Sequence, residues 1–147
     1  MKILMVSSSG GHWVQLMRTK PAFEKHNLLF ASTESDYAQH NPDQPFFVLP
    51  EASRWNKFRL VWQAVRCLVL LARLRPDIVI TTGASVGLFS LIAGKLVGAR
   101  TIWLDSIANT AELSMSGQKA HRFADLYLTQ WPELASDHGP NFEGGVI

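Results

Sequence analysis

Three short polar turns carry the residue types in this sequence that are suited to chemistry. The first is Ser9-Gly10-Gly11-His12, which directly precedes a predicted helix. Two adjacent glycines let the backbone turn tightly and expose its N–H groups, and a helix N-terminus attracts phosphate or diphosphate. An ordinary strand-to-helix turn, with serine as the helix cap, explains the same residues equally well.

His12 stands at the entrance of that helix. The positive end of a helix favours the neutral imidazole, which can accept a proton. Such a group suits a general base that deprotonates a sugar hydroxyl. The residue types alone favour the plainer alternative, a histidine that caps the helix or packs against it.

The other two turns are Thr82-Gly83-Ala84-Ser85-Val86-Gly87 and the segment that begins at Asp105. Gly83 and Ser85 could contact a second phosphate or a sugar, although the glycines also serve close helix–sheet packing. Asp105, followed by Ser106 and Asn109, could orient an acceptor hydroxyl or act as a base; a helix-capping aspartate is the alternative. No D-x-D pair or His/Cys cluster with ligand spacing occurs, so we predict no bound metal.

Other phosphate-binding signatures fit less well. The dinucleotide pattern G-x-G-x-x-G is absent, although Glu34 or Asp36 lies at about the distance expected for a ribose-binding carboxylate, which keeps a nicotinamide-dependent oxidoreductase as a weak alternative. No Lys-Ser/Thr pair follows the glycines, which excludes a P-loop. The formal net charge of +2 gives no general footprint of nucleic-acid binding, and we predict no organic cofactor.

Short apolar strands that alternate with helices must position these turns. Strands are predicted over 2–6, 27–31, 46–49, 77–81, 100–104 and 125–129, with the start of one more over 144–147; helices are predicted over 12–25, 54–74 and 85–97. This alternation predicts an α/β fold with a parallel sheet covered on both faces. The 147 residues fit a single domain, 1–147. Ligands of such sheets bind at the carboxyl ends of the strands, where all three turns fall.

The long helix over 54–74 carries a signal of its own. Arg59, Arg66 and Arg73 recur at intervals of seven, and Trp55, Trp62 and Val69 form a neighbouring stripe. Arginine beside tryptophan is typical of an interfacial helix on an anionic bilayer; a core helix with a solvated arginine edge is the alternative. Cys67 lies within the apolar run and is interpreted as a buried, inert thiol. As the only cysteine it allows no internal disulfide and favours a reducing compartment.

The uncharged stretch 78–94 is read as strand, turn and helix and not as a membrane span, because Gly83 interrupts its β-branched start. Nothing at the amino end reads as a signal peptide, because the apolar run is too short.

A series of motifs, in order along nearly the whole chain, resembles a known family. The motifs are Ser8-Ser9-Gly10-Gly11-His12, Arg75 to Gly83, Trp103-Leu104-Asp105-Ser106-Ile107-Ala108, Leu113-Ser114-Met115-Ser116-Gly117 and Ala124 to Pro132. They resemble the acceptor-side subunit of the split N-acetylglucosaminyltransferase that builds dolichol-linked oligosaccharide, and still more closely its bacterial counterparts of the PssD, EpsE and CpsF type. The Gly-Gly-His turn is also similar to that of MurG-type enzymes.

The resemblance implies the N-terminal, Rossmann-like, acceptor-binding half of a GT-B glycosyltransferase. A partner of the PssE or EpsF type would supply the UDP-sugar half. The reaction would be inverting transfer of N-acetylglucosamine, glucuronate, glucose or galactose to a polyprenyl-diphosphate-linked saccharide in polysaccharide biosynthesis. Gly10 and Gly11 would face the acceptor diphosphate, with Ser9, Gly83 and Ser85 beside it, and His12 and Asp105 would be the catalytic candidates.

The eukaryotic members of that family begin with a membrane-spanning helix, which this sequence does not show. The resemblance therefore implies peripheral attachment at the cytoplasmic face of the membrane, through the Arg/Trp helix or through the partner. A non-catalytic anchoring module for a catalytic partner remains the second hypothesis, and the small oxidoreductase the third.

Overall fold

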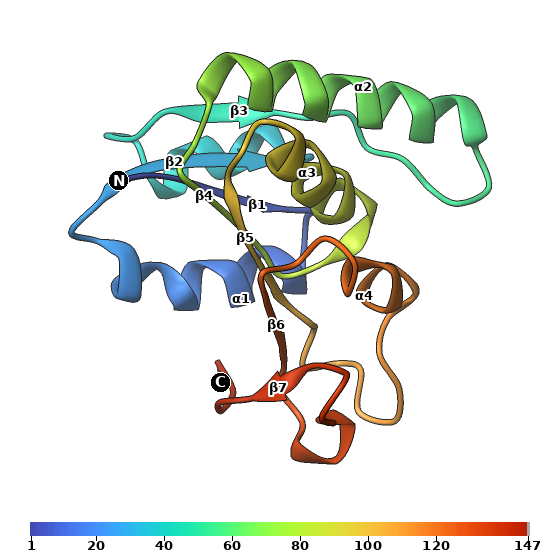
Figure 1. Cartoon of the computed structure of the whole chain (residues 1–147). Helices are drawn as coiled ribbons and strands as arrows, with labels where there is room; N and C mark the ends of the chain where they lie inside the picture. Colours follow the sequence, from blue (N-terminus) through green and yellow to red (C-terminus); the bar gives the residue numbers. More distant parts are fainter. Residues whose placement is uncertain (147) are drawn as a thin grey trace.

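A twisted parallel sheet forms the centre of the computed structural model, which describes residues 1–146 (Figure 1). Its strands follow the order β3-β2-β1-β4-β5-β6-β7, and every neighbouring pair is parallel. Their bounds are β1 Lys2–Ser7, β2 Asn27–Ser32, β3 Phe46–Val48, β4 Ile78–Thr81, β5 Arg100–Leu104, β6 Leu126–Thr129 and β7 Asn141–Phe142. The predicted α/β fold with a parallel sheet is confirmed.

Helices cover both faces of the sheet. The α-helices are α1 Gly11–Thr19, α2 Lys57–Leu74, α3 Ala84–Leu96 and α4 Met115–Ala120, with short 3-10 helices η1 Lys20–Phe23, η2 Ser35–His40 and η3 Pro132–Leu134. Figure 1 shows α1 on one side of the sheet and α2 and α3 on the other. Alternate residues of β1 follow this division, because side chains along a strand point to opposite faces. Ile3 and Met5 pack in the cluster that contains Trp13 of α1, whereas Leu4 and Val6 pack with Cys67 of α2.

The chain reverses its direction of progress across the sheet between β1 and β4. From β1 it passes through α1 to β2 on one side, and from β4 it passes through α3 to β5 on the other. The two connections therefore diverge and leave a crevice beyond the carboxyl ends of these neighbouring strands, where open α/β sheets bind their ligands. The turn at residues 8–10 and the turn at Thr82 and Gly83 border this switch point.

Two predicted helices are shorter than expected. The helix predicted over 12–25 ends at Thr19, because Pro21 lies in the 3-10 turn η1, which replaces its last residues. The helix predicted over 54–74 begins at Lys57, because the Asn56 side chain caps it by accepting a hydrogen bond from the Arg59 N–H at 3.1 Å. Trp55 therefore lies before α2 and not on its stripe.

The strand predicted over 144–147 is wrong for residues 144–146, and Ile147 lies outside the described residues. The seventh strand is β7 instead, where Asn141 and Phe142 pair with Leu128 and Thr129 of β6.

Cys67 is fully buried between α2 and α3, as predicted. Burial raises the pKa of its thiol to about 11, so the thiol stays protonated and inert at neutral pH. Within residues 1–146, no helix combines the length and the apolar composition that a membrane span requires.

Candidate active site

The turn after β1 presents its backbone at the start of α1. Gly10 adopts a φ of 76° and a ψ of −138°, and Ser9, Gly10 and Gly11 are exposed. The first N–H groups of a helix have no partner within the helix, so this turn offers donors to an anion. One donor is already engaged, because the Gly10 N–H donates to the Tyr37 hydroxyl oxygen at 2.9 Å. The Tyr37 proton stays available to a ligand, since that oxygen acts here as the acceptor.

Tyr37 had no signal in the sequence. It lies in η2, in the loop after β2, and its ring stacks on Trp13 of α1 with 4.8 Å between the ring centroids. Because the contact joins residues far apart along the chain, no local pattern announces it.

His12 is fastened to the neighbouring turn by two reciprocal hydrogen bonds. Its Nδ1 lies 2.9 Å from the Thr82 carbonyl oxygen, and the Thr82 hydroxyl donates to the His12 carbonyl at 2.6 Å. A carbonyl oxygen only accepts, so Nδ1 carries a proton, and in the neutral ring Nε2 then keeps its lone pair. The half-buried imidazole is therefore oriented by its backbone partner and presents Nε2 as a proton acceptor.

Gly83 leaves the space that the His12 ring occupies. A Cβ placed on Gly83 would lie 2.7 Å from His12 Cε1 and 2.8 Å from Nδ1, and the Gly83 φ of 137° also excludes other residues. The next residue, Ala84, has a φ of 65°. The start of α3 is thus shaped around the imidazole, and Gly83 acts through that contact.

Ser85 uses its hydroxyl proton within the protein. Its Oγ donates to Gln63 Oε1 at 2.7 Å, and Gln63 Nε2 donates to the Pro50 carbonyl at 2.8 Å. Ser85 therefore offers a ligand only its lone pairs. Gln63 is 1% exposed and shares the buried face of α2 with Cys67 and Leu71. A polar residue at this buried helical spacing was the signal that could have identified it.

Asp105 is the centre of a buried hydrogen-bond network. The side chain is 1% exposed, and its oxygens accept from Trp103 Nε1 at 3.0 Å, Asn109 Nδ2 at 3.1 Å, the Ser114 N–H at 3.1 Å and the Ser114 hydroxyl at 2.8 Å. A Cβ on Gly117 would lie 2.3 Å from Asp105 Oδ1. The Leu113-Ser114-Met115-Ser116-Gly117 motif thus closes around this carboxylate, with Ser114 as the cap of α4.

Gln15 of α1 connects the loop after β5 to the rest of the site. Its amide donates to the Ser106 hydroxyl at 3.2 Å and accepts from the Ile107 N–H at 3.0 Å and from Gln130 at 2.6 Å. The helix that carries His12 therefore also holds the loop that carries Asp105. No hydrogen bond within residues 1–146 joins the His12 side chain to the Asp105 side chain. The two catalytic candidates therefore lie in different surroundings.

The outer face of α2 is apolar. Its exposed residues are Phe58 at 91%, Val61 at 64%, Trp62 at 53%, and Val65, Leu68 and Val69 at 42–48%. The exposed Arg59, Arg66 and Arg73 accompany them, and the Arg66 guanidinium lies 5.6 Å from the centroid of the Trp62 ring. Trp55, 81% exposed, precedes the helix with Arg54 over its ring at 4.6 Å. A soluble monomer rarely exposes so contiguous an apolar surface, which marks it as an interaction surface.

No group of three or more His, Cys, Asp or Glu side chains among the first 146 residues is arranged to hold a metal ion.

Comparisons with known proteins agree with this architecture. The model of a family described as "Oligosaccharide biosynthesis protein Alg14 like" matches residues 52–144. The chain is 23% identical to the UDP-N-acetylglucosamine transferase subunit ALG14 of Homo sapiens, over 91% of this chain and 77% of that one. It is 29% identical to the corresponding subunit of Schizosaccharomyces pombe, over 43% of this chain and 32% of that one.

Among solved structures, MurG of Acinetobacter baumannii superposes with a TM-score of 0.78 at 14% identity, over 98% of this chain and 46% of the MurG chain. UDP-N-acetylglucosamine 2-epimerase of Rickettsia bellii superposes with a TM-score of 0.74 at 13% identity, over 99% of this chain and 45% of that one. The chain thus spans less than half of either protein. The fold is Rossmann-like and resembles the N-terminal half of GT-B glycosyltransferases such as MurG.

We predict that Gly83→Ala displaces the His12 imidazole. The new methyl group would lie only 2.7 Å from His12 Cε1, and the backbone at this residue is suited to glycine alone, so the free energy of unfolding should fall by about 3 kcal/mol. Urea unfolding measures the loss, and NMR of the histidine ring measures the displacement.

Gly98→Ala is the control for this prediction, because Gly98 also has a positive φ, 86°, but has nothing within 4 Å of the added Cβ. It should cost about 1 kcal/mol and leave the His12 ring resonances unchanged. Unshifted ring resonances in Gly83→Ala would contradict the contact.

Proposed function

The chain belongs to the Alg14-like family of oligosaccharide biosynthesis proteins, and we propose that it is the acceptor-binding subunit of a two-chain, inverting glycosyltransferase. Its relatives are named as subunits of a UDP-N-acetylglucosamine transferase. Its fold corresponds to less than half of the MurG chain. We infer that a partner of the PssE or EpsF type supplies the other half and holds the UDP-sugar. The sugar is N-acetylglucosamine, glucuronate, glucose or galactose.

The observation that carries this proposal is the orientation of His12 at the switch point. Its Nε2 lone pair takes the proton from the acceptor hydroxyl as that oxygen attacks the anomeric carbon of the donor. The new C–O bond forms while the bond from the anomeric carbon to UDP breaks, and UDP leaves with the electron pair. The imidazolium that results keeps its Nδ1–H bond to the Thr82 carbonyl, which stabilises the positive charge.

The acceptor in this proposal is a saccharide linked to a polyprenyl diphosphate. Its diphosphate binds between the first turns of α1 and α3, at Ser9, Gly10, Gly11, Gly83 and Ser85. Backbone N–H groups at the start of α1 supply the donors. Ser85 borders the group and does not donate to it, because its proton is held by Gln63.

Asp105 takes a positioning role in this mechanism. Both carboxylate oxygens already accept hydrogen bonds from the loop that they organise, and the side chain is buried. We therefore assign proton transfer to His12, and to Asp105 the conformation of residues 105–117.

A second candidate function is a non-catalytic anchoring module, with all catalytic groups on the partner. The apolar and arginine-bearing face of α2 supports an anchoring module as much as it supports a catalytic subunit, because an anchor needs such a surface. In both readings we propose that the face of α2, with Trp55, Trp62, Arg59, Arg66 and Arg73, contacts the cytoplasmic surface of the membrane peripherally.

For the catalytic role we predict that His12→Gln lowers turnover about 10²–10⁴-fold in the complex reconstituted with the partner, a UDP-sugar and a lipid-linked acceptor, because glutamine can still donate to Thr82 but cannot take the proton. Asp105→Asn should reduce thermal stability together with turnover, because one of the two acceptor oxygens is replaced by an NH2 group that cannot accept the hydrogen bonds made there. Initial rates and melting curves of both variants separate the two roles.

Near-wild-type turnover in the His12→Gln complex would favour the anchoring module. Comparable turnover by this chain without its partner would overturn the two-chain enzyme.

For the membrane contact we predict that the triple variant Arg59→Gln, Arg66→Gln, Arg73→Gln binds phosphatidylglycerol vesicles more weakly, by about 1 kcal/mol per charge removed near the surface. Co-sedimentation at low salt measures the effect. The double variant Lys25→Gln, Arg100→Gln removes exposed charges elsewhere and should bind like wild type. Unchanged sedimentation of the triple variant would rule out an electrostatic contact through α2.

A further inference from the structure

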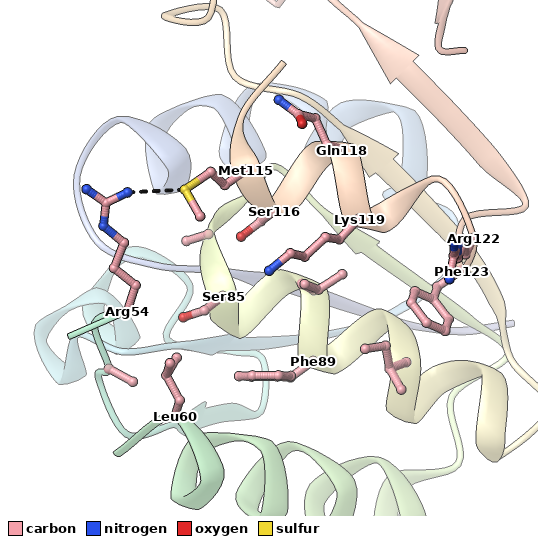
Figure 2. Close-up of a pocket in the computed structure, with 14 residues that line it drawn as sticks. Arg54, Leu60, Ser85, Phe89, Met115, Ser116, Gln118, Lys119, Arg122 and Phe123 are labelled. Atoms are coloured by element: carbon pink, nitrogen blue, oxygen red, sulfur yellow. Dashed lines mark hydrogen bonds between the residues drawn. The ribbon is translucent and has the colours of Figure 1, made fainter. Parts of the chain in front are cut away.

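A cavity of about 830 Å³ opens between the beginning of α2, the outer side of α3 and α4 (Figure 2). This volume lies within the range of about 300–1,000 Å³ that small-molecule sites occupy. Apolar side chains from three parts of the chain form most of its wall: Leu60 from α2, Leu88, Phe89 and Ile92 from α3, and Phe123 after α4. A ligand that fills it must therefore be largely apolar.

Three cations line the same cavity. They are Arg54, Lys119 and Arg122, and no aspartate or glutamate is among the lining residues. In the part of the chain that the structure describes, the one salt bridge is between Lys95 and Asp125, so these cations have no carboxylate partner. Arg54 contacts the Met115 sulfur at 3.2 Å and the Trp55 ring instead. The cavity thus combines an apolar wall with uncompensated positive charge, which suits an apolar chain with an anionic head.

One end of the cavity adjoins the candidate active site. Ala84 and Ser85 line it, and they directly follow Gly83, which lies against the His12 ring. Figure 2 shows the Lys119 side chain extending into the cavity toward Ser85 and Ser116. The proposed diphosphate position therefore borders the cavity where a cation is present, and the apolar wall leads away from His12.

The apolar wall of the cavity also adjoins the apolar face of α2. Phe89 and Ile92 lie in the cavity wall, and they line a neighbouring hollow with Val65 and Leu68 of α2, which are exposed at 44% and 42%. An apolar chain that leaves the cavity along this wall meets the surface that we assign to the membrane.

We propose that this cavity binds the first isoprene units of the polyprenyl diphosphate, with Lys119 against the diphosphate and Leu88, Phe89 and Ile92 against the hydrocarbon. The class of the ligand rests on the proposed function, and its position rests on the cavity. It gives the lipid a direction: saccharide at His12, diphosphate at the start of α3, and isoprenoid through the cavity to the membrane.

The test is calorimetric binding of farnesyl diphosphate, a short isoprenoid diphosphate, to the full chain. Ile92→Trp fills the cavity and Lys119→Glu reverses the charge at its polar end, so each should weaken binding about ten- to a hundred-fold. The matched controls are Leu96→Trp, on the same helix but 71% exposed and outside the cavity, and Lys25→Glu, an exposed lysine elsewhere. Both controls should bind like wild type.

Farnesol and inorganic diphosphate should each bind at least tenfold more weakly than farnesyl diphosphate, since each lacks one half of the complementary ligand. Equal affinity of wild type, Ile92→Trp and Lys119→Glu would overturn the proposal, and so would tight binding of inorganic diphosphate alone. If Ile92→Trp does not fold, farnesyl diphosphate binding by Lys119→Glu, a substitution on the exposed side of α4, tests the proposal instead.

Vesicle binding separates the cavity from a general lipid surface. Both cavity variants should co-sediment with phosphatidylglycerol vesicles as wild type does; a parallel loss would instead make the cavity a site for bilayer phospholipids and overturn its assignment to the isoprenoid. This experiment needs neither the partner nor turnover. If the two-chain enzyme proved wrong, the binding result would still stand, and if the cavity bound no isoprenoid, the two-chain enzyme would still be tenable.

Discussion

Two hydrogen bonds between His12 and Thr82 join the two turns on which the site depends. One runs from the imidazole Nδ1 to the Thr82 carbonyl, and the other from the Thr82 hydroxyl to the His12 carbonyl. Because β1 and β4 are neighbours whose connections diverge, their turns would otherwise border an open crevice. The reciprocal pair closes it at one point and fixes which ring nitrogen bonds to the protein. Gly83 exists as glycine for the same reason, since any side chain would displace the ring.

The surroundings of the two catalytic candidates support the different tasks that we propose for them. His12 is half-buried and in its neutral form keeps a free lone pair, whereas Asp105 is buried and accepts three hydrogen bonds from its own loop and one from Trp103 of β5. Gln15 holds both parts in register, because it lies on the helix of His12 and bonds to the loop of Asp105. Hydrogen bonds therefore hold the site where proton transfer is proposed, and the apolar surfaces that we propose for lipid lie on α2 and in the cavity beside it.

Local patterns in the sequence predicted the sheet well, because β-branched runs such as Ile78 to Thr81 and the turns after them are short-range signals. They predicted the tertiary contacts poorly. Gln15 and Gln130 are 115 positions apart, and Ser85 meets Gln63 across two elements, so no spacing rule could pair them. β7 was missed because two exposed residues, Asn141 and Phe142, carry no alternation. The sequence did not show which side of α2 is buried, because apolar residues occur all around the helix. The buried Gln63 identifies the side that packs against the rest of the fold.

The tautomer of the His12 ring, on which the proposed proton transfer at the switch point depends, can be measured directly. Long-range ¹H–¹⁵N correlation NMR of the ¹⁵N-labelled chain at neutral pH reports the tautomer of each histidine ring, and the spectrum of the His12→Gln variant identifies the signals of His12. We expect the neutral ring to carry its proton on Nδ1, held by the Thr82 carbonyl, and none on Nε2. A ring protonated at Nε2 with a bare Nδ1 would contradict it, because the bond to Thr82 would then be absent and the lone pair would face the protein.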